Sequence, residues 1–327
     1  MNPVLAREAK QRFRSGRASF AITAWVGLLG ALSYLLYVVA QELAASGGGI
    51  GRLAATAFMG RFMFHSITLL LLTAIIMVVP GIAAPSIVGE RERQTFQILQ
   101  VTQMTPRQLV IGKLLASMSF ALVLLAAVAP VAAIPLLFGG TRLTDVVAAL
   151  GMLFLTAVML ASISTWLSSR ARSTRGAVAM SYLLAFTIAF LTFVGLGVEM
   201  LFYSNFFDAD PFRVGGREVL SMLPNPYFGL VDAVQAPIGS AGFATDTPFV
   251  PFEYMLYFRQ GIADPMFGPA ANPLGQGALD VPRMPLWIWT VIIYVGITVF
   301  SLTRAAINVR APSARIRMPK RFKGTDA

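Results

Sequence analysis

Six long apolar stretches set the limits on how this chain can fold. Each has roughly the 20 mostly apolar residues that a membrane-spanning helix needs. They contain almost no ionisable side chain, the exceptions being His65 near the start of the second stretch and Glu199 at the end of the fifth. We therefore predict six transmembrane helices, over residues 18–40, 62–88, 114–138, 146–169, 176–200 and 285–303.

The composition agrees with a membrane protein. Of the 327 residues, 56% are apolar and 13% are charged, whereas about 25% are charged in an ordinary soluble domain. There is no cysteine and one histidine, so disulfides, thiolate metal sites and multi-histidine metal sites are excluded. We predict an all-α integral membrane protein in which residues 1–327 form a single transmembrane domain.

The distribution of basic residues predicts the orientation. If the N-terminus is cytoplasmic, 19 of the 26 Lys and Arg residues and 4 of the 15 acids lie in inner segments, and the rest lie in outer segments. Cytoplasmic loops carry an excess of Lys and Arg. Both termini are therefore predicted in the cytoplasm. We separately expect the membrane to be a bacterial plasma (inner) membrane. The net charge of +11 follows from this topology and requires no nucleic acid.

Two basic segments flank the predicted spans. In residues 1–17, Leu5, Ala9 and Phe13 recur every four residues opposite a basic face, which predicts an interfacial amphipathic helix. The tail, residues 304–327, is a basic juxtamembrane segment that we expect to lie against the anionic lipid of the bilayer.

The outer segment before the last span, residues 200–284, has ten prolines, nine glycines and many aromatic residues. Aromatic side chains are costly to expose to water. A structured, partly helical outer segment is one interpretation, and a loose loop is the other.

A charged block separates the second and third apolar stretches. Its first part, ERERQTFQILQVT, has the composition of a short cytoplasmic helix. A second helix is predicted to begin at Pro106, because Thr105 can act as its N-cap and Gln108 completes a capping box. With a tight turn at residues 103–105, the segment 89–105 becomes a rigid elbow at the inner membrane surface.

Apolar side chains occupy more than one side of this elbow. Phe96 and Leu99 lie on one side, and Ile98 and Val101 lie on another. In a solvated loop these four apolar side chains would be exposed to water. A cytoplasmic partner, the lipid headgroups or the chain's own helix ends must cover them, and the sequence leaves these alternatives open.

Residues 83–116, AAPSIVGERERQTFQILQVTQMTPRQLVIGKLLA, resemble the signature region of permease subunits of the ABC-2 family, the membrane halves of ATP-binding-cassette exporters. In that family an acidic-basic-acidic cluster is followed by a glycine-threonine-leucine-like segment, a Leu-x-x-Thr-Pro type element and a Gly-Lys that opens the next span. These features fall on Glu90-Arg91-Glu92, Gln94-Thr95-Phe96, Leu99 with Thr105-Pro106, and Gly112-Lys113. The chain departs from the pattern at Gln94, where glycine is common, at Phe96, where leucine is common, and in a longer gap before Thr-Pro. The segment LPNPYFGLVDAV, residues 223–234, is similar to an Asn-Pro-aromatic element of the family.

The resemblance implies that residues 90–105 form a coupling helix, which a separate ABC ATPase moves as it hydrolyses ATP. The residues implied at that interface are Glu90, Arg91, Glu92, Arg93, Thr95, Phe96, Leu99, Thr102, Met104 and Thr105. It also implies a second permease copy or a sister permease, and outward transport of a hydrophobic or amphipathic substrate.

The chain is not expected to bind the nucleotide or to be an enzyme. It has no G-x-x-x-x-G-K-[ST] loop, so ATP and Mg are expected on the partner ATPase and no cofactor is expected here. Lys113 is expected to extend its ammonium to the inner interface.

Three other classes of protein are alternatives to a permease. An ion-coupled secondary transporter or channel is disfavoured because the spans hold no ionisable residue at mid-depth. A membrane-embedded enzyme is disfavoured because His65 has no recognised ligand pattern with the outer acids Asp208 and Asp210. A membrane assembly protein without transport stays open. The polar side chains within the spans are predicted to be interhelical hydrogen-bond partners: Ser162, Ser164, Thr165, Ser181, Tyr182 and Thr187.

Overall fold

The structure is a computed structural model that describes residues 16–46, 52–96, 105–139, 141–206, 220–234 and 285–309. All regular structure in these ranges is helical. The elements, in chain order, are α2 (Gly16–Ser46), α3 (Arg52–Ala83), α4 (Pro85–Glu92), α6 (Pro106–Ala133), the 3-10 helix η1 (Ile134–Phe138), α7 (Leu143–Arg170), α8 (Thr174–Phe186), the π-helical turn η2 (Thr187–Leu191), α9 (Thr192–Phe206), the 3-10 helix η3 (Leu220–Met222), α10 (Pro226–Val234) and α12 (Leu286–Val309).

Five helices in the described ranges are long and apolar enough to cross a membrane. They are Met59–Glu92, Pro106–Ala127, Leu143–Arg170, Thr174–Glu199 and Leu286–Val309. The prediction of an all-helical protein with several membrane-type helices is confirmed at this level. The predicted first span, residues 18–40, lies on α2, whose apolar part, Thr23–Val39, is shorter than a span by the same criterion. The sixth span therefore stays a prediction.

Two predicted segments lie mostly outside the described residues. The structure describes two residues of the predicted interfacial helix 1–17, and both belong to α2. Of the basic tail it describes 304–309, which form the last residues of α12.

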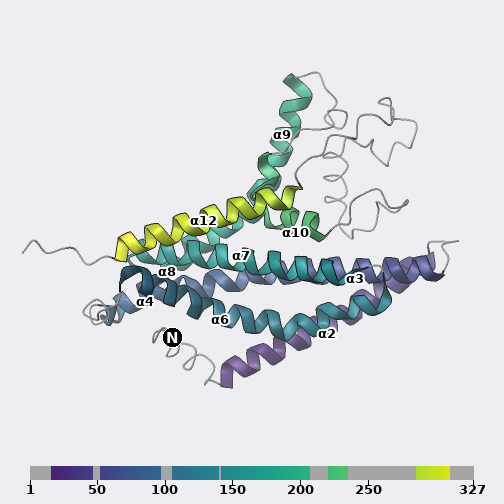
Figure 1. Cartoon of the computed structure of the whole chain (residues 1–327), viewed down its shortest axis with the longest axis horizontal. Helices are drawn as coiled ribbons and strands as arrows, with labels where there is room; N and C mark the ends of the chain where they lie inside the picture. Colours follow the sequence, from purple (N-terminus) through teal and green to yellow (C-terminus); the bar gives the residue numbers. More distant parts are fainter. Residues whose placement is uncertain are drawn as a thin grey trace, which may run out of the picture.

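The helices form an elongated bundle in which α7 is central. Figure 1 shows α3, α6, α7, α8 and α12 running alongside one another, while α9 projects away from them. α7 packs against α3, α6, α8, α10 and α12. Fifteen residues of α7 are buried, while Leu143, Val147 and Phe154 leave one face of its first half exposed.

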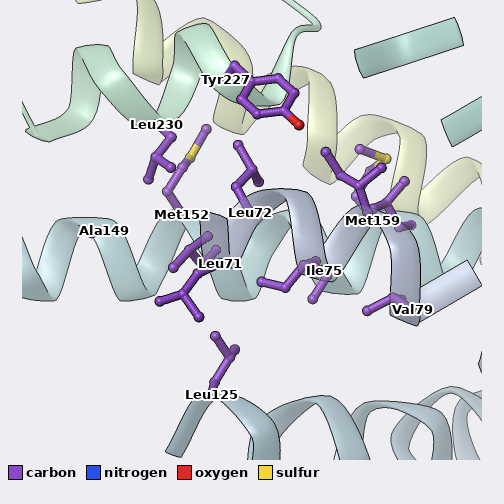
Figure 2. Close-up of a cluster of buried hydrophobic side chains, with 14 of the residues drawn as sticks. Leu71, Leu72, Ile75, Val79, Leu125, Ala149, Met152, Met159, Tyr227 and Leu230 are labelled. Carbon is purple, nitrogen blue, oxygen red and sulfur yellow. The ribbon is translucent and has the colours of Figure 1, made fainter. Parts of the chain in front are cut away.

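The core joins α3, α7 and α10. Leu72 of α3, Met152 of α7 and Leu230 of α10 belong to one cluster of buried apolar side chains (Figure 2). Tyr227 extends toward this cluster and shares a hydrogen bond of 2.9 Å with Thr73. Lipid tails are as apolar as leucine, so close packing rather than exclusion of water holds such helices together.

Part of the predicted outer segment is folded into the bundle. Asn225 is fully buried, and its Oδ1 accepts the Tyr227 N–H at 2.8 Å, which caps α10. Its Nδ2 donates to the Ala189 carbonyl of η2 at 3.2 Å. Seven of the nine residues of α10 are buried, so a loose loop is the wrong interpretation for residues 220–234.

A second set of hydrogen bonds closes the same region. The Glu199 carboxylate of α9 accepts the N–H groups of Leu220 and Ser221, each at 3.2 Å. The Asp232 carboxylate of α10 accepts the Trp287 N–H at 2.9 Å, at the start of α12. This short helical segment thus ties α9 and α12 to α10.

Candidate functional site

The predicted elbow begins as the last turns of α4, which α7 holds in place. The first four N–H groups of a helix have no partner within that helix, and the residue before α4, Ala84, makes no side-chain cap. The Ser168 hydroxyl oxygen of α7 accepts the N–H groups of Ile87 and Val88, each at 3.0 Å. Ser168 is completely buried. A neighbouring helix therefore supplies the cap that α4 lacks.

Glu90 fastens α4 to α6. Its Oε1 accepts a hydrogen bond from Lys113 Nζ, and the two groups form a salt bridge. Lys113 is 3% exposed, so the expectation that it extends to the membrane interface is wrong. An ammonium extends to the interface when nothing nearby neutralises it, and here Glu90 does so inside the protein.

Arg91 fastens α4 to α7. Its Nη1 donates to the Ser169 carbonyl at 2.8 Å, and its guanidinium carbon lies 5.0 Å from the centre of the Phe96 ring. Asn308, near the end of α12, donates its side-chain N–H to Ser169 Oγ at 2.9 Å. Ser169 is therefore a shared contact of α4 and α12.

Glu92 fastens α4 to α8. One carboxylate oxygen accepts the Thr174 N–H at 2.7 Å, and the other accepts the Thr174 hydroxyl at 2.5 Å. Thr174 is the first residue of α8, and the Ser173 side chain caps the same helix by accepting the Gly176 N–H. A carboxylate at a helix N-terminus is stabilised by the helix dipole. Glu92 therefore helps to hold the start of α8.

Phe96 is covered by the chain's own helix ends. It is 8% exposed and belongs to a group of buried apolar residues that we name the junction cluster. Its members are Ile87 of α4, Phe96, Leu109 and Val110 of α6, and Ala305, Ala306 and Val309 of α12. Of the alternatives that the sequence left open, the helix ends are the ones that cover Phe96.

The chain turns sharply between Glu92 and Phe96. The predicted short helix through ERERQTFQILQVT is interrupted: Glu90, Arg91 and Glu92 are helical as the end of α4, but α4 ends there and a turn follows at Arg93 and Gln94. Gln94 has a φ of 58°, in the left-handed region that favours glycine. Arg93, Gln94 and Thr95 are all exposed. We name these three residues the exposed turn.

Gln94→Gly is expected to raise the free energy of unfolding by about 0.5–1 kcal/mol. The left-handed conformation costs a residue with a β-carbon about 1–2 kcal/mol, and glycine avoids this cost. Glycine loses more chain entropy on folding, which reduces the stabilisation by about 0.5–1 kcal/mol. Chemical denaturation of the detergent-purified protein measures the change. Gln94→Val is the comparison and is expected to destabilise, because a β-branched residue is strained at positive φ. A loss of stability in Gln94→Gly would contradict the assignment.

The second half of the elbow agrees with its prediction where it is described. Thr105 is extended, its hydroxyl oxygen accepts the Gln108 N–H at 3.3 Å, and Gln108 Oε1 accepts the Thr105 N–H at 3.0 Å. The capping box and the start of α6 at Pro106 are confirmed. The predicted turn at 103–105 lies, apart from Thr105, outside the described residues.

The ten predicted interface residues fall into three groups. Glu90, Arg91, Glu92 and Phe96 contact other parts of this chain. Arg93, Thr95 and Thr105 are exposed. Leu99, Thr102 and Met104 lie outside the described residues.

Sequence reasoning missed the residues that receive these contacts. Ser168, Ser169 and Thr174 lie about 80 positions further along the chain than their α4 partners. The only signal was the polar sequence SSRARST at the end of the fourth predicted span. That run has the composition of an ordinary helix end.

Most polar side chains within the spans bond to their own helix. The hydroxyls of Ser162, Ser164, Thr165 and Thr187 donate to carbonyls three or four residues earlier. The prediction of interhelical bonds is therefore wrong for these four. It is confirmed for Tyr182 of α8, whose hydroxyl donates to the Met77 carbonyl of α3 at 2.7 Å. Ser181 Oγ is buried and has no hydrogen-bond partner in the described ranges.

His65 is buried inside the bundle. Its Nδ1 lies 3.0 Å from the Arg61 carbonyl oxygen, one helical turn away. The described ranges contain no group of three or more His, Asp or Glu side chains that could hold a metal ion. Asp208 and Asp210 lie outside those ranges.

Comparison of the sequence with protein-family models and with curated proteins finds no match. The resemblance to ABC-2 permeases therefore stays a prediction from the sequence of residues 83–116 and 223–234.

Proposed function

We propose that the chain is the permease subunit of an ATP-driven ABC transporter, coupled through residues 90–105 to a separate ATPase. One observation carries the proposal. Three consecutive side chains bond to three different helices: Glu90 to α6, Arg91 to α7 and Glu92 to α8. The exposed turn follows directly after them. A force applied to that turn would therefore reach three spans at once.

The partner is an ABC ATPase, and the exposed turn is its first point of contact. The end of the bundle that holds α4 faces the cytoplasm in the predicted orientation. The transporter contains a second permease copy or a sister permease, and its substrate is hydrophobic or amphipathic. This chain is then not an enzyme, and ATP and Mg bind on the ATPase.

Arg93→Glu tests the coupling assignment. We expect it to lower the amount of ATPase that co-purifies with the chain about tenfold, which corresponds to the loss of one charge-assisted hydrogen bond. Unfolding should be unchanged, because Arg93 is exposed. The measurement uses an ABC ATPase from the same organism, co-expressed with this chain.

Arg142→Glu is the matched control. It makes the same charge change at an exposed arginine next to the start of α7, at the opposite end of that helix. Equal retention of the ATPase by both variants would contradict the coupling assignment. Failure of the wild-type chain to retain any ATPase would contradict the proposed function itself.

An ion-coupled carrier is the second candidate, and the buried pair of Lys113 and Glu90 favours it. Ionisable groups within membrane helices commonly carry protons or ions, and Glu90 Oε2 is buried with no hydrogen-bond partner in the described ranges. The pair lies near the ends of its two helices. This position suits a structural ion pair between α4 and α6 better than a group that carries protons or ions. Uptake driven by a pH gradient in vesicles without any ATPase would favour the carrier.

A further inference from the structure

The ends of α7 and α12 share an aromatic pair. Trp166 of α7 and Phe300 of α12 meet edge to face, with ring centres 5.8 Å apart and planes at 70°. The two helices lie side by side and both end toward α4 (Figure 1). The Asn308–Ser169 hydrogen bond of 2.9 Å confirms that their last turns are neighbours.

An arginine follows each aromatic residue after one helical turn. Arg170 lies with its guanidinium carbon 5.7 Å from the Trp166 ring, and Arg304 lies at the same distance from the Phe300 ring. Because the two helices run in the same direction, each arginine lies one turn closer to the shared helix ends than its ring. Both arginines are exposed. Neither has an ion-pair partner in the part of the chain that the structure describes.

This arrangement suits one kind of ligand. Guanidinium groups bind phosphate through several hydrogen bonds in a fixed plane. Aromatic side chains such as Trp are enriched where hydrocarbon meets headgroups, and basic pockets between spans on the cytoplasmic side bind acidic lipid headgroups. Phe300 is 53% exposed, so an acyl chain can lie along it. A soluble anion would gain nothing from that ring.

We propose that Trp166, Arg170, Phe300 and Arg304 form a binding site for an anionic phospholipid. The two arginines hold its phosphate, and the aromatic pair lies against the upper part of an acyl chain. Trp166 also packs against the junction cluster, so a bound lipid adjoins the helix ends that cover Phe96. The site depends on the membrane placement of α7 and α12 and does not require the proposed transport activity.

Lipid binding to the purified full-length chain tests the site. Native mass spectrometry in detergent would count bound dioleoyl phosphatidylglycerol and dioleoyl phosphatidylcholine during a titration. We expect the wild type to prefer phosphatidylglycerol. The double variant Arg170→Gln/Arg304→Gln is expected to bind it about 30-fold more weakly, given the usual gain from two basic residues at an anionic surface. Arg170→Lys/Arg304→Lys keeps the charge but loses the planar hydrogen-bonding geometry, so its affinity for phosphatidylglycerol is expected to lie between those of the wild type and the Gln double variant.

Arg172→Gln/Arg175→Gln is the matched control, because both arginines are exposed at the same end of the bundle and the charge change is identical. We expect its affinity to change less than about threefold. Equal losses in the two Gln double variants would mean that only diffuse positive charge attracts the lipid, and the site would be disproved. Displacement of the lipid by inorganic phosphate at constant ionic strength would identify a free-anion site and would also overturn the proposal. Melting temperatures of all variants show whether they are folded.

Discussion

Lys113→Met is expected to lower the free energy of unfolding by about 3 kcal/mol. Removing one partner of a buried ion pair leaves the other charge uncompensated, which costs about 3–5 kcal/mol. The lower end applies because 24% of the Glu90 side chain is exposed. Denaturation of the purified protein in mixed micelles would measure the change.

The double variant Glu90→Leu/Lys113→Met is expected to recover most of that loss, since apolar residues of similar size replace a buried ion pair at little cost. Arg107→Met is the control. Arg107 is exposed on the same helix as Lys113, and its loss should change the free energy of unfolding by less than about 0.5 kcal/mol. Equal effects of Lys113→Met and Arg107→Met would show that the ion pair does not stabilise the fold.

Ser168→Ala is expected to destabilise the protein by about 2 kcal/mol. The hydroxyl accepts two backbone N–H groups of α4, and a buried donor that loses its partner costs about 1–3 kcal/mol. The last turns of α4 should then exchange their amide hydrogens faster. Hydrogen exchange over residues 85–92, measured together with denaturation, would detect both effects.

Ser162→Ala is the matched control for this change. Ser162 is also completely buried on α7, but its hydroxyl donates to the Met159 carbonyl of its own helix. That carbonyl keeps its normal helical hydrogen bond, so little stability should be lost. A Ser162→Ala variant as unstable as Ser168→Ala would mean that the effect comes from cavity formation and not from the cap of α4.

The helices of this protein were largely predictable because their signal is local. A run of some 20 apolar residues has few alternatives to a membrane helix, and the predicted starts of the later spans differ from those observed by a few residues. The start of α6 was predicted to the residue, since Thr105, Pro106 and Gln108 are neighbours in sequence and make the capping box by themselves.

The contacts of the candidate site were not predictable because they join distant parts of the chain. Arg91 and Glu92 have partners about 80 positions away, and the sequence around Arg91 and Glu92 gives no indication of which residues these partners are. Lys113 looked like an interfacial lysine because Glu90, 23 positions earlier, lies on another helix. The prediction of interhelical hydrogen bonds for the serines and threonines of α7 was wrong for the opposite reason. A carbonyl one turn earlier is always within reach of a short hydroxyl side chain, so they needed no neighbour.

The π-helical turn η2 has a consequence for the length of the helix that contains it. Such a turn holds one residue more than an α-helical turn, and so rotates every later side chain by about 100° around the axis. Glu199, which follows the π-helical turn, accepts a hydrogen bond from the Ser221 hydroxyl. Asn225 donates a hydrogen bond to the Ala189 carbonyl within the turn itself. Insertion or deletion of one residue between Thr187 and Glu199 would rotate the Glu199 carboxylate to another side of the helix, away from Ser221. The number of residues between Thr187 and Glu199 is therefore fixed by the contacts at the two ends of this stretch.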